Sequence, residues 1–184
     1  KPYQQLPFQY SLHIVEKEGA SLQHKEFLAE IDDKNFLRHF AESMINDIPE
    51  NGSVIVYNQN FEHSRINELA IMFPDLEKEL KRINSNMVDF LPPFKQRHFY
   101  MKEMRGSASI KQVLPALYPN EQDLDYHNLS VVHNGSEASE TFLSLRGKTK
   151  ERQKELRKGL LVYCELDTYA MVKIWEKLKE VTNT

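Results

Sequence analysis

A short apolar run, SVIVYN at residues 53–58, is the feature that most limits which folds this sequence can adopt. Unbroken β-branched runs are typical of strands that are covered on both faces. Upstream, residues 8–15 and 22–29 predict a hairpin with its turn at residues 17–20. The order hairpin, helix, strand, helix and then mostly helix predicts an α/β fold, in which a mixed sheet carries helices on both faces.

Helical periodicity accounts for much of the remaining chain. The expected helices cover residues 33–48, 61–73, 109–115, 136–145 and 150–179, the last as two helices with a bend near Tyr163. We expect Asp33 and Ser136 to be N-caps. The prolines at residues 92–93 are expected to break a helix-and-loop section at residues 75–96.

Length and composition limit the class of protein. The 184 residues fit one domain and carry a net charge of −3. The chain has a single cysteine, which excludes a disulfide framework and favours a cytoplasmic protein. No apolar run reaches membrane-spanning length, and no signal peptide is recognisable. Because the chain begins at Lys1 and not at methionine, we expect an N-terminally truncated fragment of a larger protein.

An aspartate interrupts the apolar face of the last predicted helix. Six residues recur at helical spacing there, and five of them are apolar: Leu160, Cys164, Asp167, Met171, Ile174 and Leu178. Removing a carboxylate from water without a partner costs roughly several kcal/mol, so we expect Asp167 to be protonated, paired or bound to a cation. Tyr163, one turn earlier, lies on the same side of the helix.

A second acidic residue begins an apolar stripe after the predicted central strand. Glu62 precedes Ile66, Leu69 and Phe73 at spacings of four, three and four, just beyond the carboxyl end of that strand. Glu62 and Asp167 could together bind Mg²⁺ or Mn²⁺, which prefer oxygen ligands. The alternative is structural: Asp167 pairs with a cation such as Arg157 or Lys111, and Glu62 interacts with its helix dipole.

Four segments taken in order carry a resemblance: VIVYNQNFEHSRINELA, DFLPPF, GSASIKQVLPALYP and YCELDTYAMVKI. Together they resemble an uncharacterised bacterial family of unknown function. That family is in turn similar to the DEDD-type 3′-to-5′ exonucleases, of the Tyr-x-x-x-Asp subclass. The resemblance extends over nearly the whole chain and implies a single exonuclease-like domain at residues 1–184 with a ribonuclease-H-like fold.

The resemblance also implies a chemistry and residue roles. Such enzymes hydrolyse phosphodiesters with two Mg²⁺ or Mn²⁺ ions about 4 Å apart. Asp167 would hold the ion that activates water, Tyr163 would orient or deprotonate that water, and Glu62 would bind the second ion. Asn58 and Phe61 would position the 3′ end of single-stranded DNA or RNA.

The first motif of these exonucleases, Asp-x-Glu on a leading strand, is missing before residues 1–13. We expect that strand upstream of Lys1, which leaves a gap in the sheet and an inactive or nearly inactive chain. The full-length protein, with its other domains, would be the exonuclease. The alternative is a catalytically silent module that binds nucleic acid or protein.

Two basic features bear on nucleic-acid binding. The run KTKERQKELRKG at residues 148–159 is typical of a solvated helix face, and contact with nucleic acid is the alternative. Lys111 follows the hydroxyls of Ser107 and Ser109 and is a candidate phosphate contact.

Overall fold

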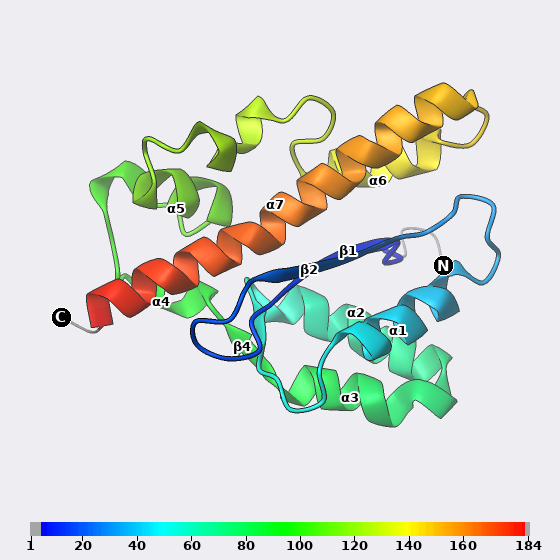
Figure 1. Ribbon diagram of the computed structural model, residues 1–184, viewed down its shortest axis with the longest axis horizontal. Coiled ribbons are helices and arrows are strands. Elements are labelled where there is room, and N and C mark those ends of the chain that lie inside the picture. Colours follow the sequence, from blue (N-terminus) through cyan, green and yellow to red (C-terminus); the bar gives the residue numbers. More distant parts are fainter. Residues whose placement is uncertain (1–4, 183–184) are drawn as a thin grey trace. The chain divides into compact units, whose positions relative to one another are not determined.

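An antiparallel hairpin opens the part of the chain that the computed structural model describes, residues 5–182 (Figure 1). Strands β1 (Gln9–Ile14) and β2 (Gln23–Leu28) pair in a register that places Gln9 opposite Leu28. At the turn, the Ala20 amide donates to the Lys17 carbonyl at 3.0 Å, and Gly19 has a φ of 78°. The alternating pattern therefore predicted the hairpin and its turn correctly.

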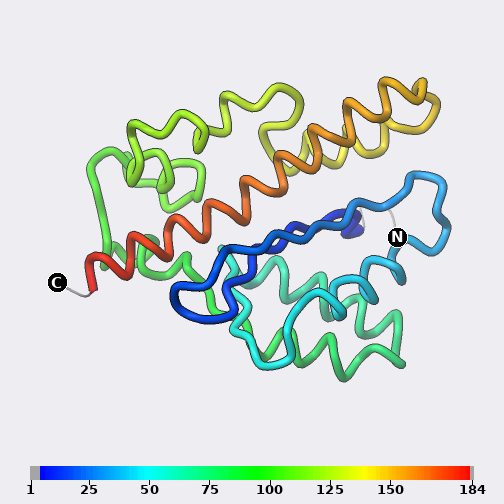
Figure 2. Tube along the Cα trace, viewed as in Figure 1, coloured from blue at the N-terminus to red at the C-terminus, as the bar shows by residue number. Residues whose placement is uncertain are grey.

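The chain forms two compact units, residues 1–89 and residues 90–184. Figure 2 shows the path of the chain through both. All strands of the described residues belong to the first unit. The structure thus confirms a mixed α/β protein that consists mostly of helices.

The first unit contains a parallel strand pair joined by helices. After the hairpin come α1 (Phe36–Asp47), β3 (Val54–Val56), α2 (Gln59–Met72), the short η1 (Pro74–Leu76), α3 (Glu77–Ser85) and β4 (Met87–Asp89). Strands β3 and β4 are parallel, with Val54 opposite Met87. In the described residues the strands form two separate two-stranded sheets, where we expected one mixed sheet.

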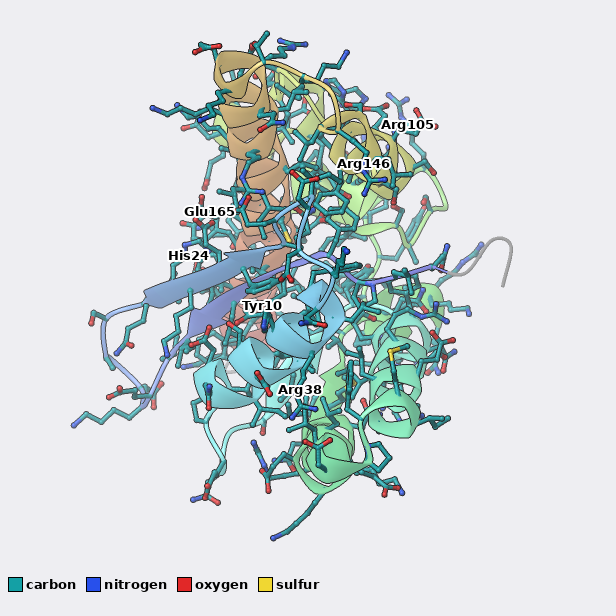
Figure 3. The ribbon with its side chains drawn as sticks, turned by 90° about the vertical axis from the view of Figure 1, so that its right-hand side faces the viewer. Tyr10, His24, Arg38, Arg105, Arg146 and Glu165 are labelled. Carbon is teal, nitrogen blue, oxygen red and sulfur yellow. The ribbon has the colours of Figure 1, made fainter. Side chains whose placement is uncertain are left out.

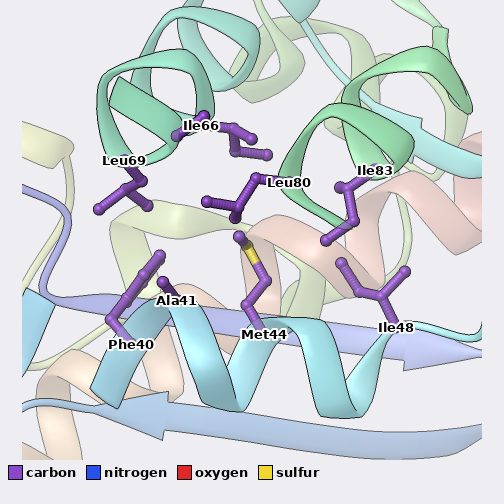
Figure 4. Packing of buried hydrophobic residues seen from close by; sticks show 9 residues of the cluster. Phe40, Ala41, Met44, Ile48, Ile66, Leu69, Leu80 and Ile83 are labelled. Carbon is purple, nitrogen blue, oxygen red and sulfur yellow. The ribbon is translucent and has the colours of Figure 1, made fainter. Parts of the chain in front are cut away.

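The core of the first unit lies between three helices (Figure 4). Helix α1 contributes Phe40, Ala41, Met44 and, just after its end, Ile48; α2 contributes Ile66, Leu69 and Ala70; and α3 contributes Leu80 and Ile83. The spacing of these residues follows the helical repeat, which is why the apolar periodicity located α1 and α2. The hairpin packs on this core through Tyr10, Leu12 and Phe27.

Tyr10, labelled in Figure 3, joins the hairpin to α1. Its ring lies 5.4 Å from that of Phe40 in an edge-on contact. Its hydroxyl donates to Asp47 at 2.6 Å and contacts the Ser43 hydroxyl at 2.7 Å. Lys25 on β2 binds the other oxygen of Asp47 at 3.0 Å. Asp47 therefore connects both strands to the last turn of α1.

The second unit is built on one long helix. Its elements are α4 (Leu91–Lys95), η2 (Lys102–Met104), α5 (Ile110–Leu117), η3 (Gln122–Leu124), η4 (Tyr126–Asn128), α6 (Gly135–Ser144) and α7 (Lys150–Thr182). Helices α5 and α6 contact α7. Helix α7 is a single helix of 33 residues, so the expectation of two helices over residues 150–179 is wrong. No described helix combines the length and the apolar character needed to cross a lipid bilayer.

The first helix begins later than expected. Asn35, and not Asp33, occupies the N-cap position of α1. Asp33 instead accepts a hydrogen bond from the Asn35 amide at 2.8 Å and binds His39 Nδ1 at 2.6 Å. These two contacts lower the pKa of the Asp33 carboxyl. Asp33 thus stabilises the approach to the helix from one turn outside it.

Two further boundary predictions are also corrected. Asn134, and not Ser136, caps α6, and its side chain accepts a hydrogen bond from the Glu137 amide at 3.0 Å. Asparagine is as good an N-cap as serine, so the sequence offered two candidates two residues apart. Pro92 and Pro93 do not break a helix. They lie in the first turn of α4, where a missing amide proton is tolerated.

Candidate functional site

Tyr163 and Asp167 lie one turn apart on α7, on the side that packs against the rest of the second unit. Tyr163 is buried. Asp167 keeps some exposed surface, but its carboxyl is densely surrounded, and this burial raises its pKa. Hydrogen bonding from Tyr126 and Tyr163 and the charge of Lys111 act in the opposite direction, without cancelling the effect of burial. We call these four residues the Asp167 cluster.

Lys111 on α5 is the cation of the Asp167 cluster. Its ammonium group donates a short hydrogen bond to the His133 carbonyl. The same group lies 5.1 Å from the centre of the Tyr126 ring and 5.4 Å from that of Tyr163. Three groups of its own unit thus engage this ammonium, which favours a positioning role over the phosphate contact that we expected.

Tyr126 belongs to the cluster although the sequence did not indicate it. Its ring meets that of Tyr163 edge-on, with centres 6.2 Å apart. Its hydroxyl is buried and has no hydrogen-bond partner at ordinary distance among the described residues, so its interaction with the Asp167 carboxyl is a long one. Tyr126 lies in the short η4, where no periodic pattern could reveal it.

The protonation state of Tyr163 follows from its surroundings. Burial and the neighbouring Asp167 charge both raise the pKa of the Tyr163 hydroxyl far above its usual range. The phenol is therefore protonated at neutral pH and can donate a hydrogen bond. Of the two roles expected for Tyr163, orienting a water molecule fits this state, whereas removing its proton does not.

The loop before α6 holds the carbonyl group that Lys111 contacts. The His133 amide donates to Glu137 at 2.9 Å, and the His133 ring nitrogen Nδ1 lies 2.8 Å from the same carboxylate oxygen. Asn134 binds the other oxygen of Glu137 at 2.6 Å. These bonds lower the pKa of the Glu137 carboxyl. The start of α6 therefore fixes one side of the Asp167 cluster.

The predicted site residues Asn58, Phe61 and Glu62 lie at the start of α2, in the first unit. Asn58 occupies the N-cap position with a φ of 76°, a left-handed conformation that asparagine tolerates better than most residues. The Asn58 and Gln59 amides donate to the two carboxylate oxygens of Asp89, at 2.9 and 3.1 Å. Asp89 therefore caps α2 from the end of β4, a contact that the sequence did not reveal because β4 has only three residues.

Phe61 and Glu62 follow in the first turn of α2. Phe61 is 51% exposed, and the Arg65 guanidinium lies 5.9 Å from the centre of its ring. Glu62 is half-buried. Both side chains thus lie near the carboxyl end of the parallel pair β3–β4, the edge where α/β proteins place their ligands.

The predicted site residues fall into two groups. The structure brings Lys111, Tyr163 and Asp167 together in the second unit, whereas Asn58, Phe61 and Glu62 belong to the first unit. Within either unit, no three described histidine, cysteine, aspartate or glutamate side chains place ligand atoms within 4.8 Å of one another. Neither group alone therefore fits a centre for two divalent cations, which needs several oxygen ligands.

Comparisons with known proteins give a family but no activity. The model of a family described as "Domain of unknown function (DUF2779)" matches residues 1–109. An uncharacterized protein of Mycoplasma genitalium, MG366, is 27% identical over 150 residues, which are 76% of this chain and 22% of that protein. The uncharacterized protein UU173 of Ureaplasma parvum is 29% identical over 168 residues, 82% of this chain and 24% of that protein.

A homologue of MG366 in Mycoplasma pneumoniae is 29% identical over 142 residues, 71% of this chain and 21% of that protein. The chain thus spans less than a quarter of the length of these curated relatives. No solved structure matches it significantly. Because the family model covers more than half of the 184 residues, the chain belongs to the DUF2779 family of unknown function.

Proposed function

We propose that this chain is part of a metal-dependent 3′-to-5′ exonuclease that hydrolyses nucleic-acid phosphodiesters on a ribonuclease-H-like fold. The observation that supports this most is the pair formed by Tyr163 and Asp167, one turn apart on α7 with the phenol beside an enclosed carboxyl. A titratable group with a raised pKa and a specific hydrogen-bonding neighbour is typical of functional sites. The reaction class comes from the resemblance to the exonucleases, which rests on the four sequence segments taken in order.

In this proposal the side chains have distinct tasks. In the complete protein, Asp167 and Glu62 would each supply a carboxylate to Mg²⁺ or Mn²⁺, and the bound ions would supply charge stabilisation for phosphodiester hydrolysis. Tyr163 donates a hydrogen bond that orients the attacking water. Phe61, which is exposed, packs against the 3′-terminal nucleotide, and Asn58 helps to position it.

The proposal concerns the longer protein. Neither unit alone holds enough ligand atoms for two cations, and the expected Asp-x-Glu strand lies outside the described residues. We therefore expect residues 1–184 alone to show little or no hydrolysis. The upstream strand and the other domains of the polypeptide would complete the site.

One observation favours the second candidate, a catalytically silent module that binds nucleic acid or protein. The ammonium group of Lys111 already offsets part of the charge of Asp167, as a purely structural cluster would require. In that case Asp167 contributes to the packing of α5 against α7, and neither Asp167 nor Glu62 binds a metal ion.

Hydrolysis by the full-length protein distinguishes the two candidates. We would measure the shortening of a 5′-labelled single strand, as DNA and as RNA, in Mn²⁺, and compare Asp167→Asn with Asp123→Asn, an exposed aspartate of the same unit. Loss of shortening only in Asp167→Asn supports the exonuclease. If the protein shortens neither strand and Asp167→Asn leaves Mn²⁺ binding unchanged, the silent module is the correct interpretation.

A further inference from the structure

Positive charge gathers on the turn between α6 and α7 and on the first turns of α7. Residues 146–158 contain seven basic side chains and two acidic ones, Glu151 and Glu155. This segment has a net charge of +5, so the rest of a chain whose total is −3 carries −8. We call the basic side chains of this segment the basic surface; they are Arg146, Lys148, Lys150, Arg152, Lys154, Arg157 and Lys158. Arg146 is labelled in Figure 3.

Helix stability does not explain this charge. The N-terminal end of a helix carries a partial positive charge, so Lys150 and Arg152 in the first turn of α7 lie at the end that disfavours cations. Lys150, Lys154 and Lys158 also follow one another at four-residue spacing, where like charges repel. Arg152 is partly offset by Glu155, at 2.6 Å. Lys150 and Arg152 thus lie where the helix dipole disfavours them, and the segment has only two acidic residues for its seven basic ones.

The geometry of the basic surface fits an extended polyanion. Lys150, Lys154 and Lys158 are exposed, whereas Leu156 and Leu160, on the other side of α7, are buried. Successive lysines of this row are separated by about 6 Å along the helix axis. The phosphates of one stacked nucleic-acid strand are separated by about 3.4 Å, so each step along the row corresponds to about two phosphates.

The side chains of α7 favour nucleic acid over a membrane as the partner of the basic surface. A helix that lies on a membrane needs an apolar face free to enter the lipid, and the apolar face of α7 is already buried within its own unit. A row of lysines without a free apolar face suits a phosphate backbone, which is bound mainly through charge.

We propose that the basic surface binds the phosphate backbone of single-stranded nucleic acid without regard to sequence. Only the choice of nucleic acid as the polyanion rests on the proposed exonuclease function. Lys158 and Asp167 are nine residues apart and point to opposite sides of α7, so the basic surface can be altered without touching the Asp167 cluster.

Equilibrium binding tests this proposal without hydrolysis. We would titrate the full-length protein into a labelled single strand of about 20 nucleotides, with EDTA present, and follow fluorescence anisotropy at several salt concentrations. The variant is Lys150→Gln/Lys154→Gln/Lys158→Gln. The control, Lys17→Gln/Lys34→Gln/Lys78→Gln, makes the same change in net charge at exposed lysines elsewhere. Circular dichroism would show that both variants keep the helical content of the parent.

We expect the variant to bind more weakly and its salt dependence to become shallower by about two, since each lost phosphate contact contributes about 0.7 to the slope on a single strand. The control should match the parent protein. Equal weakening in both variants, no weakening in either, or tighter binding to poly-aspartate or to anionic phospholipid vesicles than to the strand would overturn the proposal. EDTA removes divalent ions, so binding is measured separately from metal-dependent hydrolysis. A protein that binds the strand in EDTA but does not shorten it in Mn²⁺ would contradict the exonuclease and still support the basic surface.

Discussion

Replacing Gly159 by alanine sets two effects of opposite sign against each other. In the middle of a helix, alanine is favoured over glycine by about 1 kcal/mol. At this position, however, a Cβ atom would lie 2.5 Å from Cβ of Val131 and 2.8 Å from each of its methyl groups. Carbon atoms in contact are normally about 3.5–4.0 Å apart. The loop that carries Val131 would therefore have to withdraw by about 1 Å.

The size of the net effect follows from what must move. The nearest atom is a Cβ, which is attached directly to the backbone, so Val131 cannot avoid the contact by changing its rotamer alone. Overpacking of this kind costs about 1–3 kcal/mol. After subtracting the helix-propensity gain, we expect Gly159→Ala to lower the free energy of unfolding of the second unit by up to about 2 kcal/mol.

Urea unfolding followed by the fluorescence of Trp175, the single tryptophan, measures this effect in the unit that contains α7. Gly135→Ala is the matched control, because an added Cβ there meets nothing within 4 Å. Val131→Gly should remove most of the penalty, so the double variant should be more stable than the sum of the two single changes predicts. A stabilised Gly159→Ala variant, or additive effects in the cycle, would refute the reasoning.

Three further predictions test the remaining structure. Tyr10→Phe removes the hydrogen bond to Asp47 and should lower stability by about 0.5–3 kcal/mol in thermal unfolding, whereas an unchanged transition would show that water replaces it. Asp89→Ala removes the cap of α2 and should lower the free energy of unfolding by about 0.5–2 kcal/mol. Asn58→Gly relieves a positive φ and should not destabilise the protein. If urea unfolding shows Asn58→Gly to be the less stable variant, the capping role of Asp89 is contradicted. The raised pKa of Asp167 stabilises the fold below the unfolded-state value of 3.8, and this contribution is lost as the pH rises through the higher folded value. Asp167→Asn should therefore be at least as stable as the parent at pH 7, with the difference shrinking toward pH 3.8, and a variant that is less stable at pH 7 would contradict this sign.

The helices were the most predictable part of the fold. Helical spacing located α1 and α2, because each of these helices buries one face against a core. Strand β4 was missed because three residues carry no period. Helix α7 was expected as two helices, but it continues as one past Gly159 and Tyr163, since a single glycine costs a helix only about 1 kcal/mol.

The candidate site was predictable only along single helices. The spacing of Tyr163 and Asp167 already indicated that they share one side of α7, and the structure places them together. Tyr126 and Asp89 lie at the ends of very short elements and reach their partners only through the folded structure. No local pattern in the sequence predicts these contacts.

Asp167, on the apolar face of α7, lowers the stability of the fold near neutral pH. Its enclosure raises the pKa of a carboxyl that must nevertheless be accommodated near neutral pH, and Lys111 and two phenols only partly offset that effect. A leucine or asparagine would suit such a helix position better if packing were the only demand. Positions where a sequence departs from local rules at a cost in stability are those where function is expected. The same reasoning applies to the basic surface at the start of this helix, where lysines lie against the helix dipole. Helix α7 thus carries an enclosed carboxyl and, at its start, lysines that lie against its dipole, and we propose that both features act on a phosphate backbone.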